Sequence, residues 1–336
     1  MSAPIGILLV NLGTPDAPTR GAVYRYLRQF LTDGRVIDIP WLPRQLLVQG
    51  IIAPFRSGQS AKGYQKLWTD EGSPLKVYGE KLAKGVQSIL GDGYAVELGM
   101  RYQNPSIESA IARLNARNIQ KLVVLPLFPH YASASTGSVY EEVMRVLSKQ
   151  QSVPHLRIIQ SFHDYAPMIQ VFADNARKFD LGSYDHFLFS YHGLPQRQMK
   201  KADRCNHCLN VEDCCQQFSE VNAACYSAQC YDTSRAIATE LGLKRSQYSV
   251  CFQSRLGRDP WIQPYTPVML AERAKAGDKR LLVFSPAFVS DCLETIVEIS
   301  EEYFEEFEQM CGGHLDLVPS LNDNPKWIQA VADLVR

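Results

Sequence analysis

The chain has 336 residues, of which 46% are hydrophobic, so it is long enough for two compact domains that each have a core. Lysine plus arginine and aspartate plus glutamate balance at 35 each, which leaves no broad field to attract nucleic acid. The first residues lack the basic segment and the cleavage site of a secretory signal, and no apolar run reaches the roughly 18 residues that span a bilayer. These properties predict a cytoplasmic globular protein with no nucleic-acid partner.

Short runs rich in Val, Ile, Leu and Phe alternate with helical patterns along the chain. Eight of these runs are typical of strands: residues 5–10, 94–99, 121–125, 156–159, 186–190, 248–252, 280–284 and 315–318. Helical periodicity is clear at residues 22–31, 106–117, 138–149 and 325–335. Such alternation predicts an α/β fold with parallel sheets flanked by helices. Functional residues should then lie just past the carboxyl ends of the strands.

A short internal similarity indicates two related halves. Residues 122–128 and 281–288 both read as a strand, a proline, an aromatic residue and a small-residue loop that leads into a helix. We expect two similar Rossmann-like domains, residues 1–162 and 163–336. The second should carry a cysteine-rich insert at 200–230 and end in a helix that packs back on the first. The glycine spacings that cradle nucleotide phosphates are missing, so nucleotide binding has little support.

Three glutamates share one face of the helix that is predicted after residues 280–284. Glu294, Glu298 and Glu302 are four residues apart, so the face drifts by about 40° per step, and a widened π-type turn would align them better. A row of carboxylates can pass a hydrated divalent cation along a path and can accept protons. A solvated acidic face is the alternative, and further glutamates nearby support it.

His192 directly follows a predicted strand and precedes Gly193 and Pro195, which open the backbone. A neutral imidazole can ligate a transition metal or accept a proton near neutral pH. A structural hydrogen-bonding role is the alternative for a lone histidine. Together with the glutamate row at another strand end, His192 and Glu294 would bracket a metal ion. No G-x-S-x-G motif or Ser-His-Asp order is visible, which weakens a hydrolase interpretation.

The most apolar segment, residues 37–55, is interrupted by three prolines, one arginine and two glutamines. It is too broken to span a membrane. We interpret it as the lip of a pocket or as a shallow contact with the inner face of the membrane, with core packing as the alternative.

Six of the nine cysteines lie between residues 205 and 230. In a cytoplasmic chain such cysteines are better interpreted as thiols or metal ligands than as disulfides. Cys205 and Cys208 form a C-x-x-C pair, and Cys225 and Cys230 form a C-x₄-C pair. Paired thiolates at these spacings suit tetrahedral Zn²⁺ or an iron–sulfur cluster, and unligated thiols are the alternative.

Seven motifs, taken together and in order, resemble the ferrochelatase family. They are NLGTP at residues 11–15, EGSPL at 71–75, PLFP at 126–129, SYHGLP at 190–195, FQSR at 252–255, WIQPYT at 261–266 and DCLET at 291–295. The resemblance extends from about residue 5 to residue 334. It implies two similar α/β domains with a cleft between them. It also implies a lyase that inserts Fe²⁺ into protoporphyrin IX, with release of two protons, to form protohaem.

The same resemblance implies roles for individual residues. His192 and Glu294 would be the catalytic and metal-site pair, and Glu298 and Glu302 would continue the acidic track. Arg101 would bind a propionate group of the porphyrin through a bidentate contact, with a structural salt bridge as its alternative. The apolar wall of the pocket would come from four further residues: Trp261, Tyr102, Leu12 and Tyr131.

Some members of the family carry a [2Fe–2S] cluster, and the cysteine-rich insert resembles an internal version of that site. The expected ligands are Cys208, Cys215, Cys225 and Cys230, with Cys205 and Cys214 as alternates and Zn²⁺ as the runner-up. A non-catalytic iron–sulfur or haem-binding sensor on the same fold is the alternative function. The presence of His192 and of the glutamate row favours the enzyme.

Overall fold

The computed structural model describes residues 3–257 and 259–336 of the chain, which folds into two compact units. The first unit contains the chain up to Phe128, Ala132–Ser161 and Asn322–Arg336. The second contains Pro129–Tyr131 and Phe162–Leu321. The C-terminal helix therefore belongs to the same unit as the N-terminal strand.

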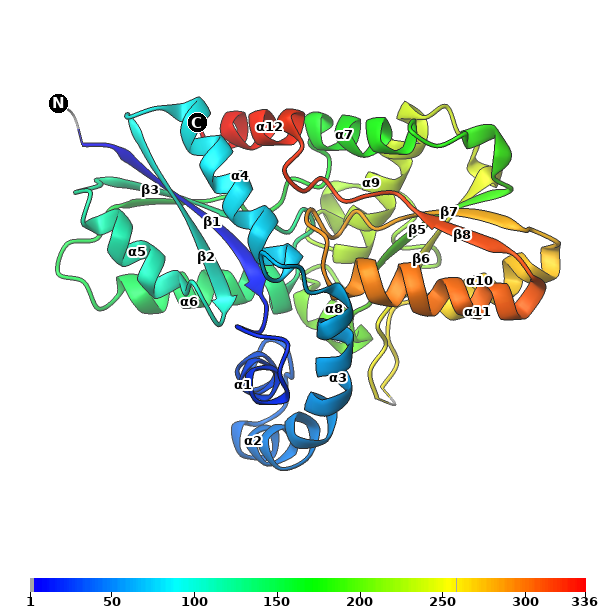
Figure 1. Ribbon diagram of the computed structural model, residues 1–336, viewed down its shortest axis with the longest axis horizontal. Helices are drawn as coiled ribbons and strands as arrows, with labels where there is room; N and C mark the ends of the chain where they lie inside the picture. The colour runs from blue at the N-terminus through cyan, green and yellow to red at the C-terminus, as the bar shows by residue number, and fades with distance from the viewer. Residues whose placement is uncertain (1–2, 258) are drawn as a thin grey trace. The chain divides into compact units, whose positions relative to one another are not determined.

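Each unit is built on a four-stranded sheet in which all neighbouring strands are parallel. The first sheet has the order β2-β1-β3-β4, with β1 at Ile5–Gly13, β2 at Tyr94–Tyr102, β3 at Lys121–Pro126 and β4 at His155–Ile158. The second has the order β6-β5-β7-β8, with β5 at His186–His192, β6 at Tyr248–Gln253, β7 at Arg280–Phe284 and β8 at His314–Leu317. The predicted α/β fold with parallel sheets is confirmed (Figure 1).

Helices cover both faces of the first sheet (Figure 1). Leu8 and Val10 of β1 pack against the apolar sides of α5 and α6. On the other face α12 packs on α4, and Gly85 permits this contact because a Cβ atom there would lie 2.7 Å from Ile328. The helices of this unit are α1 Arg20–Leu31, α2 Trp41–Leu47, α3 Ala53–Leu67, α4 Pro74–Leu90, α5 Ile107–Asn115, α6 Ser138–Leu147 and α12 Pro325–Val335.

The second sheet is covered in the same way. Leu188 and Val283 share a core with α10, α11 and the π-helix η6, and α7 packs on α9. Short 3₁₀ turns occur at Leu181–Ser183, Glu220–Asn222 and Arg245–Gln247. The longer helices are α7 Ala166–Ala176, α8 Gln196–Ala202, α9 Tyr226–Glu240, α10 Thr266–Ala276, η6 Glu294–Tyr303 and α11 Phe304–Cys311.

The internal similarity in the sequence corresponds to a shared topology. β3 and β7 hold the same place in their sheets, each beside the first strand of its unit. A π-helix follows each of them: η2 at Ser133–Gly137 and η6 at Glu294–Tyr303. A third π-helix, η1 at Val48–Ile52, joins α2 to α3.

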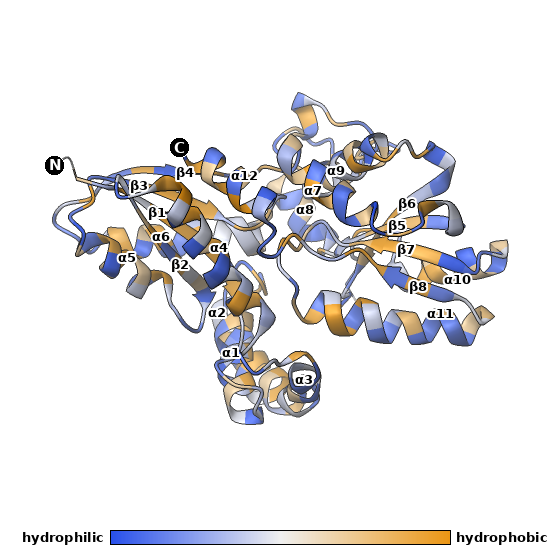
Figure 2. Ribbon diagram, turned by 45° about the horizontal axis from the view of Figure 1, so that its top comes forward, coloured by the Kyte–Doolittle hydropathy of each residue, from blue (hydrophilic) through white to orange (hydrophobic). Residues whose placement is uncertain are grey.

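Apolar residues are concentrated in the strands of both sheets (Figure 2). Among the residues that the structure describes, no helix is both long enough and apolar enough to cross a membrane.

Candidate functional site

His192 is the last residue of β5, and its ring has a defined protonation pattern. Its Nδ1 lies 2.7 Å from the carbonyl oxygen of Gly193. Because a carbonyl only accepts hydrogen bonds, Nδ1 carries the proton of the neutral ring. Nε2 therefore presents a lone pair that can accept a proton or bind a metal ion.

The turn after His192 is closely packed. A Cβ atom at Gly193 would lie 2.9 Å from the carbonyl oxygen of Gln253 and 3.1 Å from Cε3 of Trp261, so only glycine fits without displacing neighbours. The Trp261 ring centroid lies 6.4 Å from that of His192. Since only 8% of Trp261 is exposed, its main contribution in this structure is to support the turn that carries His192.

The predicted glutamate row lies on a π-helix. Glu294, Glu298 and Glu302 all fall within η6, whose widened turns suit the alignment that their spacing requires. Glu294 and Glu298 are partly buried, and Glu302 is exposed. The row therefore runs from the interior of the second unit towards solvent.

Glu298 is held by three hydrogen-bond donors. Its Oε2 accepts from Nε2 of Gln253 at 3.0 Å and from Oγ of Ser254 at 2.6 Å, and its Oε1 accepts from the Tyr303 hydroxyl at 2.9 Å. Burial and the Glu298 carboxylate raise the pKa of Tyr303, which therefore stays a donor. These three contacts fix the position of the carboxylate.

Gln253 connects His192 to the glutamate row, although it was not among the site residues predicted from the sequence. It ends β6 directly beside His192 in the sheet register, and its backbone carbonyl accepts the N–H of Gly193. Its side-chain oxygen accepts from Ser190 at 2.7 Å, which points Nε2 at Glu298 and at the backbone carbonyl of Glu294, 3.3 Å away. The sequence marked it only as a polar residue at a strand end and as part of the FQSR motif.

Glu294 begins the π-helix next to a buried thiol. Burial and the nearby Glu294 carboxylate raise the pKa of Cys292. The thiol is therefore neutral near pH 7 and does not add a second negative charge beside Glu294.

In the first unit, Arg101 and Tyr102 belong to a buried polar network. Arg101 Nη2 lies 2.8 Å from Asp33 Oδ2, and the Tyr102 and Ser138 hydroxyls donate to the same oxygen at 2.8 and 2.6 Å. Burial alone would raise the pKa of Asp33, but these hydrogen bonds, the Arg35 N–H and the Arg101 charge lower it.

This network bears on two expectations. Arg101 forms a salt bridge with Asp33, which is the alternative weighed from the sequence, and its contact with a propionate stays a prediction. The Tyr102 side chain is fully buried, so it offers no wall to a substrate. Leu12 on β1 and Tyr131 after β3 are partly exposed and stay available for an apolar contact.

Four cysteine thiols converge in the insert that precedes α9. Cys215 Sγ lies 3.5 Å from that of Cys214 and 3.9 Å from that of Cys225, and Cys208 contacts Cys225. Contact with Cys225 lowers the pKa of Cys208 despite its burial. Cys230 is fully buried in α9, where its thiol contacts the Tyr226 hydroxyl.

A carboxylate orders the first turn of the insert. Asp203 accepts the backbone N–H groups of Cys205 at 2.9 Å and Cys208 at 2.7 Å. Cys205 itself is exposed. Over residues 3–257 and 259–336, no three His, Cys, Asp or Glu side chains have the spacing of a formed metal site.

Comparison with known proteins gives a consistent result. The model of the family described as Ferrochelatase matches residues 4–336. The ferrochelatase of Coxiella burnetii strain RSA 493 is 46% identical over 332 residues, which cover 99% of this chain and 93% of that protein. The ferrochelatase of Legionella pneumophila strain Lens is 45% identical over 330 residues, 98% of each chain.

The fold has relatives among solved structures at much lower identity. The sirohydrochlorin chelatase SirB of Bacillus subtilis subspecies spizizenii, solved with cobalt, superposes with a TM-score of 0.56 at 11% identity. The match covers 99% of this chain and 94% of SirB, and at this identity it establishes the fold alone. Because the family model and the two bacterial relatives cover nearly the whole sequence, this chain belongs to the ferrochelatase family.

Proposed function

We propose that this chain inserts Fe²⁺ into protoporphyrin IX, with His192 as the proton acceptor and Glu294 as its carboxylate partner. Family membership makes the chain a lyase, a metal chelatase of haem biosynthesis. The observation that carries the assignment of His192 is the hydrogen bond from Nδ1 to the Gly193 carbonyl. This bond leaves Nε2 as the basic atom of a neutral imidazole at a strand end.

The reaction exchanges two pyrrole protons for one Fe²⁺ ion. His192 Nε2 accepts a proton from the macrocycle, since a neutral imidazole is an effective base near neutral pH. Glu294, partly buried at the start of η6, takes part as a second proton acceptor or as an oxygen ligand to the incoming iron. Charge balances because two protons leave as one divalent cation enters.

The remaining glutamates form a path for ions. Glu298 is held by three hydrogen-bond donors, and Glu302 lies at the exposed end of the row. Carboxylates at such spacing exchange hydrated Fe²⁺ stepwise or carry protons outward. We assign Glu302 to capture from solvent and Glu298 to transfer towards Glu294.

We propose that Tyr131 and the slightly exposed side chain of Trp261, both in the second unit, contact the porphyrin, and that Leu12 of the first unit is a candidate for a further apolar contact. All three are apolar or aromatic, as a planar apolar substrate requires. A contact between Arg101 and a propionate group stays a prediction, because in this structure its guanidinium pairs with Asp33.

We propose that the insert holds a [2Fe–2S] cluster, with Zn²⁺ as the runner-up. The grouped thiols of Cys208, Cys215 and Cys225 support three of the ligands expected from the sequence. For the fourth, contact with Cys215 now favours Cys214 over Cys230. A bound cluster would cross-link the insert and could accept or donate one electron.

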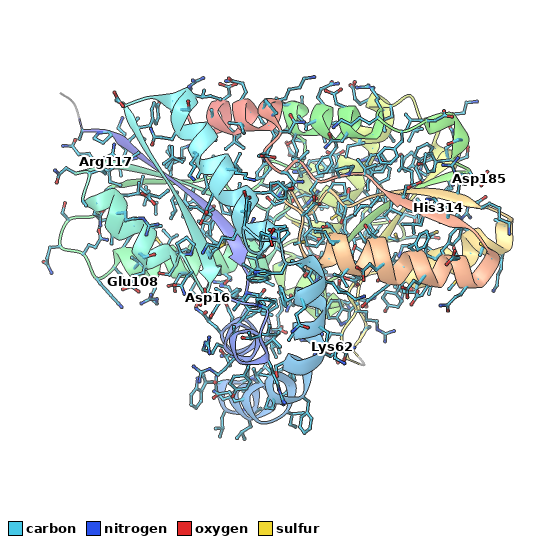
Figure 3. The ribbon with its side chains drawn as sticks, in the orientation of Figure 1. Asp16, Lys62, Glu108, Arg117, Asp185 and His314 are labelled. Carbon is cyan, nitrogen blue, oxygen red and sulfur yellow. The ribbon has the colours of Figure 1, made fainter. Side chains whose placement is uncertain are left out.

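We also propose that α2, η1 and α3 dock on an anionic lipid surface. Five large apolar side chains are well exposed there: Trp41, Leu42, Leu46, Ile51 and Phe55. Residues 41–67 contain four basic and no acidic residues, and Lys62 of α3 is labelled in Figure 3. An apolar face with basic neighbours is typical of interfacial helices. Phe55→Ser should reduce sedimentation with phosphatidylserine vesicles, and unchanged binding would contradict this contact.

The assignment of His192 is tested by His192→Ala. Iron insertion should fall by about 10²-fold or more, the usual loss when a general base is removed. Quenching of protoporphyrin fluorescence should show that porphyrin still binds. The matched control is His314→Ala on β8, an exposed histidine labelled in Figure 3, which should keep full activity. If His192→Ala retains more than about a tenth of the wild-type turnover, His192 is not the general base.

A further inference from the structure

We infer that Tyr226 is a positioning residue that links the cysteine cluster of the insert to His192. This inference rests on the proposed iron insertion and on metal binding by the clustered thiols. It assigns a role to Tyr226 that neither the motifs nor the glutamate row indicates.

The link to His192 is a direct hydrogen bond. The Tyr226 hydroxyl donates to the backbone carbonyl oxygen of His192 at 2.9 Å. This carbonyl belongs to the residue whose ring is oriented through Gly193. A displacement of the Tyr226 hydroxyl therefore acts on the peptide that sets the direction of the imidazole.

The hydroxyl has little freedom to move independently. The Tyr226 side chain is 7% exposed, and its ring packs edge-on against His130 with centroids 5.9 Å apart. His130 also packs edge-on against Tyr191, the neighbour of His192 in β5. The Cys230 thiol contacts the Tyr226 hydroxyl from the next turn of α9. Tyr226 thus transmits the position of the helix start to β5.

Tyr226 is connected to the thiol cluster through its peptide bond to Cys225. Cys225 directly precedes Tyr226 and caps α9, and its sulfur lies 3.9 Å from that of Cys215. Metal binding holds thiolates in fixed geometry and orders the segment that carries them. Loading of the cluster therefore fixes the start of α9, and with it the hydrogen bond from Tyr226 to His192.

A second contact from the insert offers a different route. The Phe218 ring packs at a tilt against that of His163, with centroids 4.9 Å apart, and the backbone carbonyl of His163 accepts from Thr233 in the middle of α9. Ordering of the insert could therefore affect α9 through these contacts without the Tyr226 hydroxyl. The experiment must therefore separate the hydroxyl of Tyr226 from the general ordering of the insert.

The test compares wild type with Tyr226→Phe, each in cluster-loaded and chelator-stripped form. In wild type, stripping should lower kcat by roughly five-fold, the factor expected when one hydrogen bond is lost, with little change in KM for porphyrin. In Tyr226→Phe, kcat should be low in both forms and the ratio should approach one. Tyr184→Phe, which loses a hydrogen bond to Asp316 at the opposite end of β5, should keep the wild-type ratio.

Amide hydrogen exchange provides a readout that does not depend on activity. The N–H of Gly193 donates to Gln253, and loading should slow its exchange in wild type but not in Tyr226→Phe. The visible spectrum and iron content of loaded Tyr226→Phe should match wild type, which shows that the cluster is intact.

If cluster loading changes kcat and the exchange of the Gly193 N–H equally in wild type and in Tyr226→Phe, the proposed role of Tyr226 is wrong. The absence of any loading effect in wild type would overturn it as well. Failure of the underlying proposal is recognised separately, because wild-type protein would then lack thiol-bound metal or iron-insertion activity.

Discussion

The side-chain amide of Gln253 lies 3.0 Å from the Glu298 carboxylate and connects the end of β6 to the glutamate helix. The same Nε2 lies 3.3 Å from the Glu294 carbonyl oxygen, and Gln253 pairs with His192 in the sheet. One buried residue thus contacts both the strand that carries His192 and the helix that carries the glutamate row.

Gln253→Leu preserves much of the side-chain volume but removes this connection. Hydrogen bonds to charged groups contribute about 1.5–3 kcal/mol, so kcat for iron insertion should fall by roughly ten-fold or more. Steady-state kinetics under anaerobic conditions would measure the loss. Gln309→Leu, at an exposed position of α11, is the matched control. Equal activity of the two variants would show that Gln253 has no positioning role.

The two ends of the glutamate row should respond differently to loss of charge. Glu294→Gln should lower kcat by about 10²-fold, as expected when a group that transfers protons is removed. Glu302→Gln should chiefly raise KM for Fe²⁺, because Glu302 is exposed at the solvent end. Equal and mild effects at both positions would indicate an ordinary solvated acidic face. Glu306→Gln, exposed on α11, controls for the change in net charge.

The choice of the fourth cluster ligand can be tested with two serine variants. Cys214→Ser should lose the visible absorbance and the acid-labile sulfide, because its sulfur contacts Cys215. Cys230→Ser should retain both, since Cys230 lies fully buried within α9. The reverse outcome would restore Cys230 as the ligand. Colourless wild-type protein with one zinc per chain would indicate a zinc site.

His186 should make the second unit sensitive to moderate acid. Burial, together with the charges of Arg273 and Arg245, lowers the pKa of His186 to about 4 in the folded chain. In the unfolded chain a histidine has a pKa of about 6.5, so as the pH falls His186 is protonated in the unfolded chain before it is protonated in the folded one. The stabilisation that the neutral ring provides is complete above about pH 6.5 and is lost between there and about pH 4.

Urea unfolding of His186→Asn measures this contribution. The variant should lose less stability than wild type between pH 7 and pH 4.5, because one titrating group has been removed. His155→Asn, at an exposed position, should follow the wild-type dependence. Parallel pH profiles for wild type and His186→Asn would rule out the assigned cause.

Much of this fold could be predicted from the sequence because its strands are buried on both faces. Leu8 and Leu9 of β1 are both fully buried, which explains the continuous apolar run rather than an alternating one. Residue spacing likewise placed Glu294 and Glu298 on one helix face, and the π-helix follows the widened turn that their alignment suggested.

Other parts of the site depend on contacts that spacing does not encode. Asp33 is 68 residues from Arg101, so their ion pair could not be recognised without the fold. The contacts of Gln253 could not be predicted for the same reason, because its partners lie on a strand and a π-helix that are distant in sequence. The segment from α2 to α3 contains prolines at 43 and 54 yet is helical, since Pro54 occupies the first turn of α3 and a π-helix joins the two helices.

A single-turnover experiment under anaerobic conditions tests the central claim most directly. Protein mixed with protoporphyrin IX and Fe²⁺ would be followed by the absorbance of haem and, with a pH indicator, by proton release. We predict haem formation with two protons released per haem in wild type, and neither signal on that timescale in His192→Ala. Wild-type protein that binds both substrates but forms no haem, or a His192→Ala variant as fast as wild type, would contradict the account.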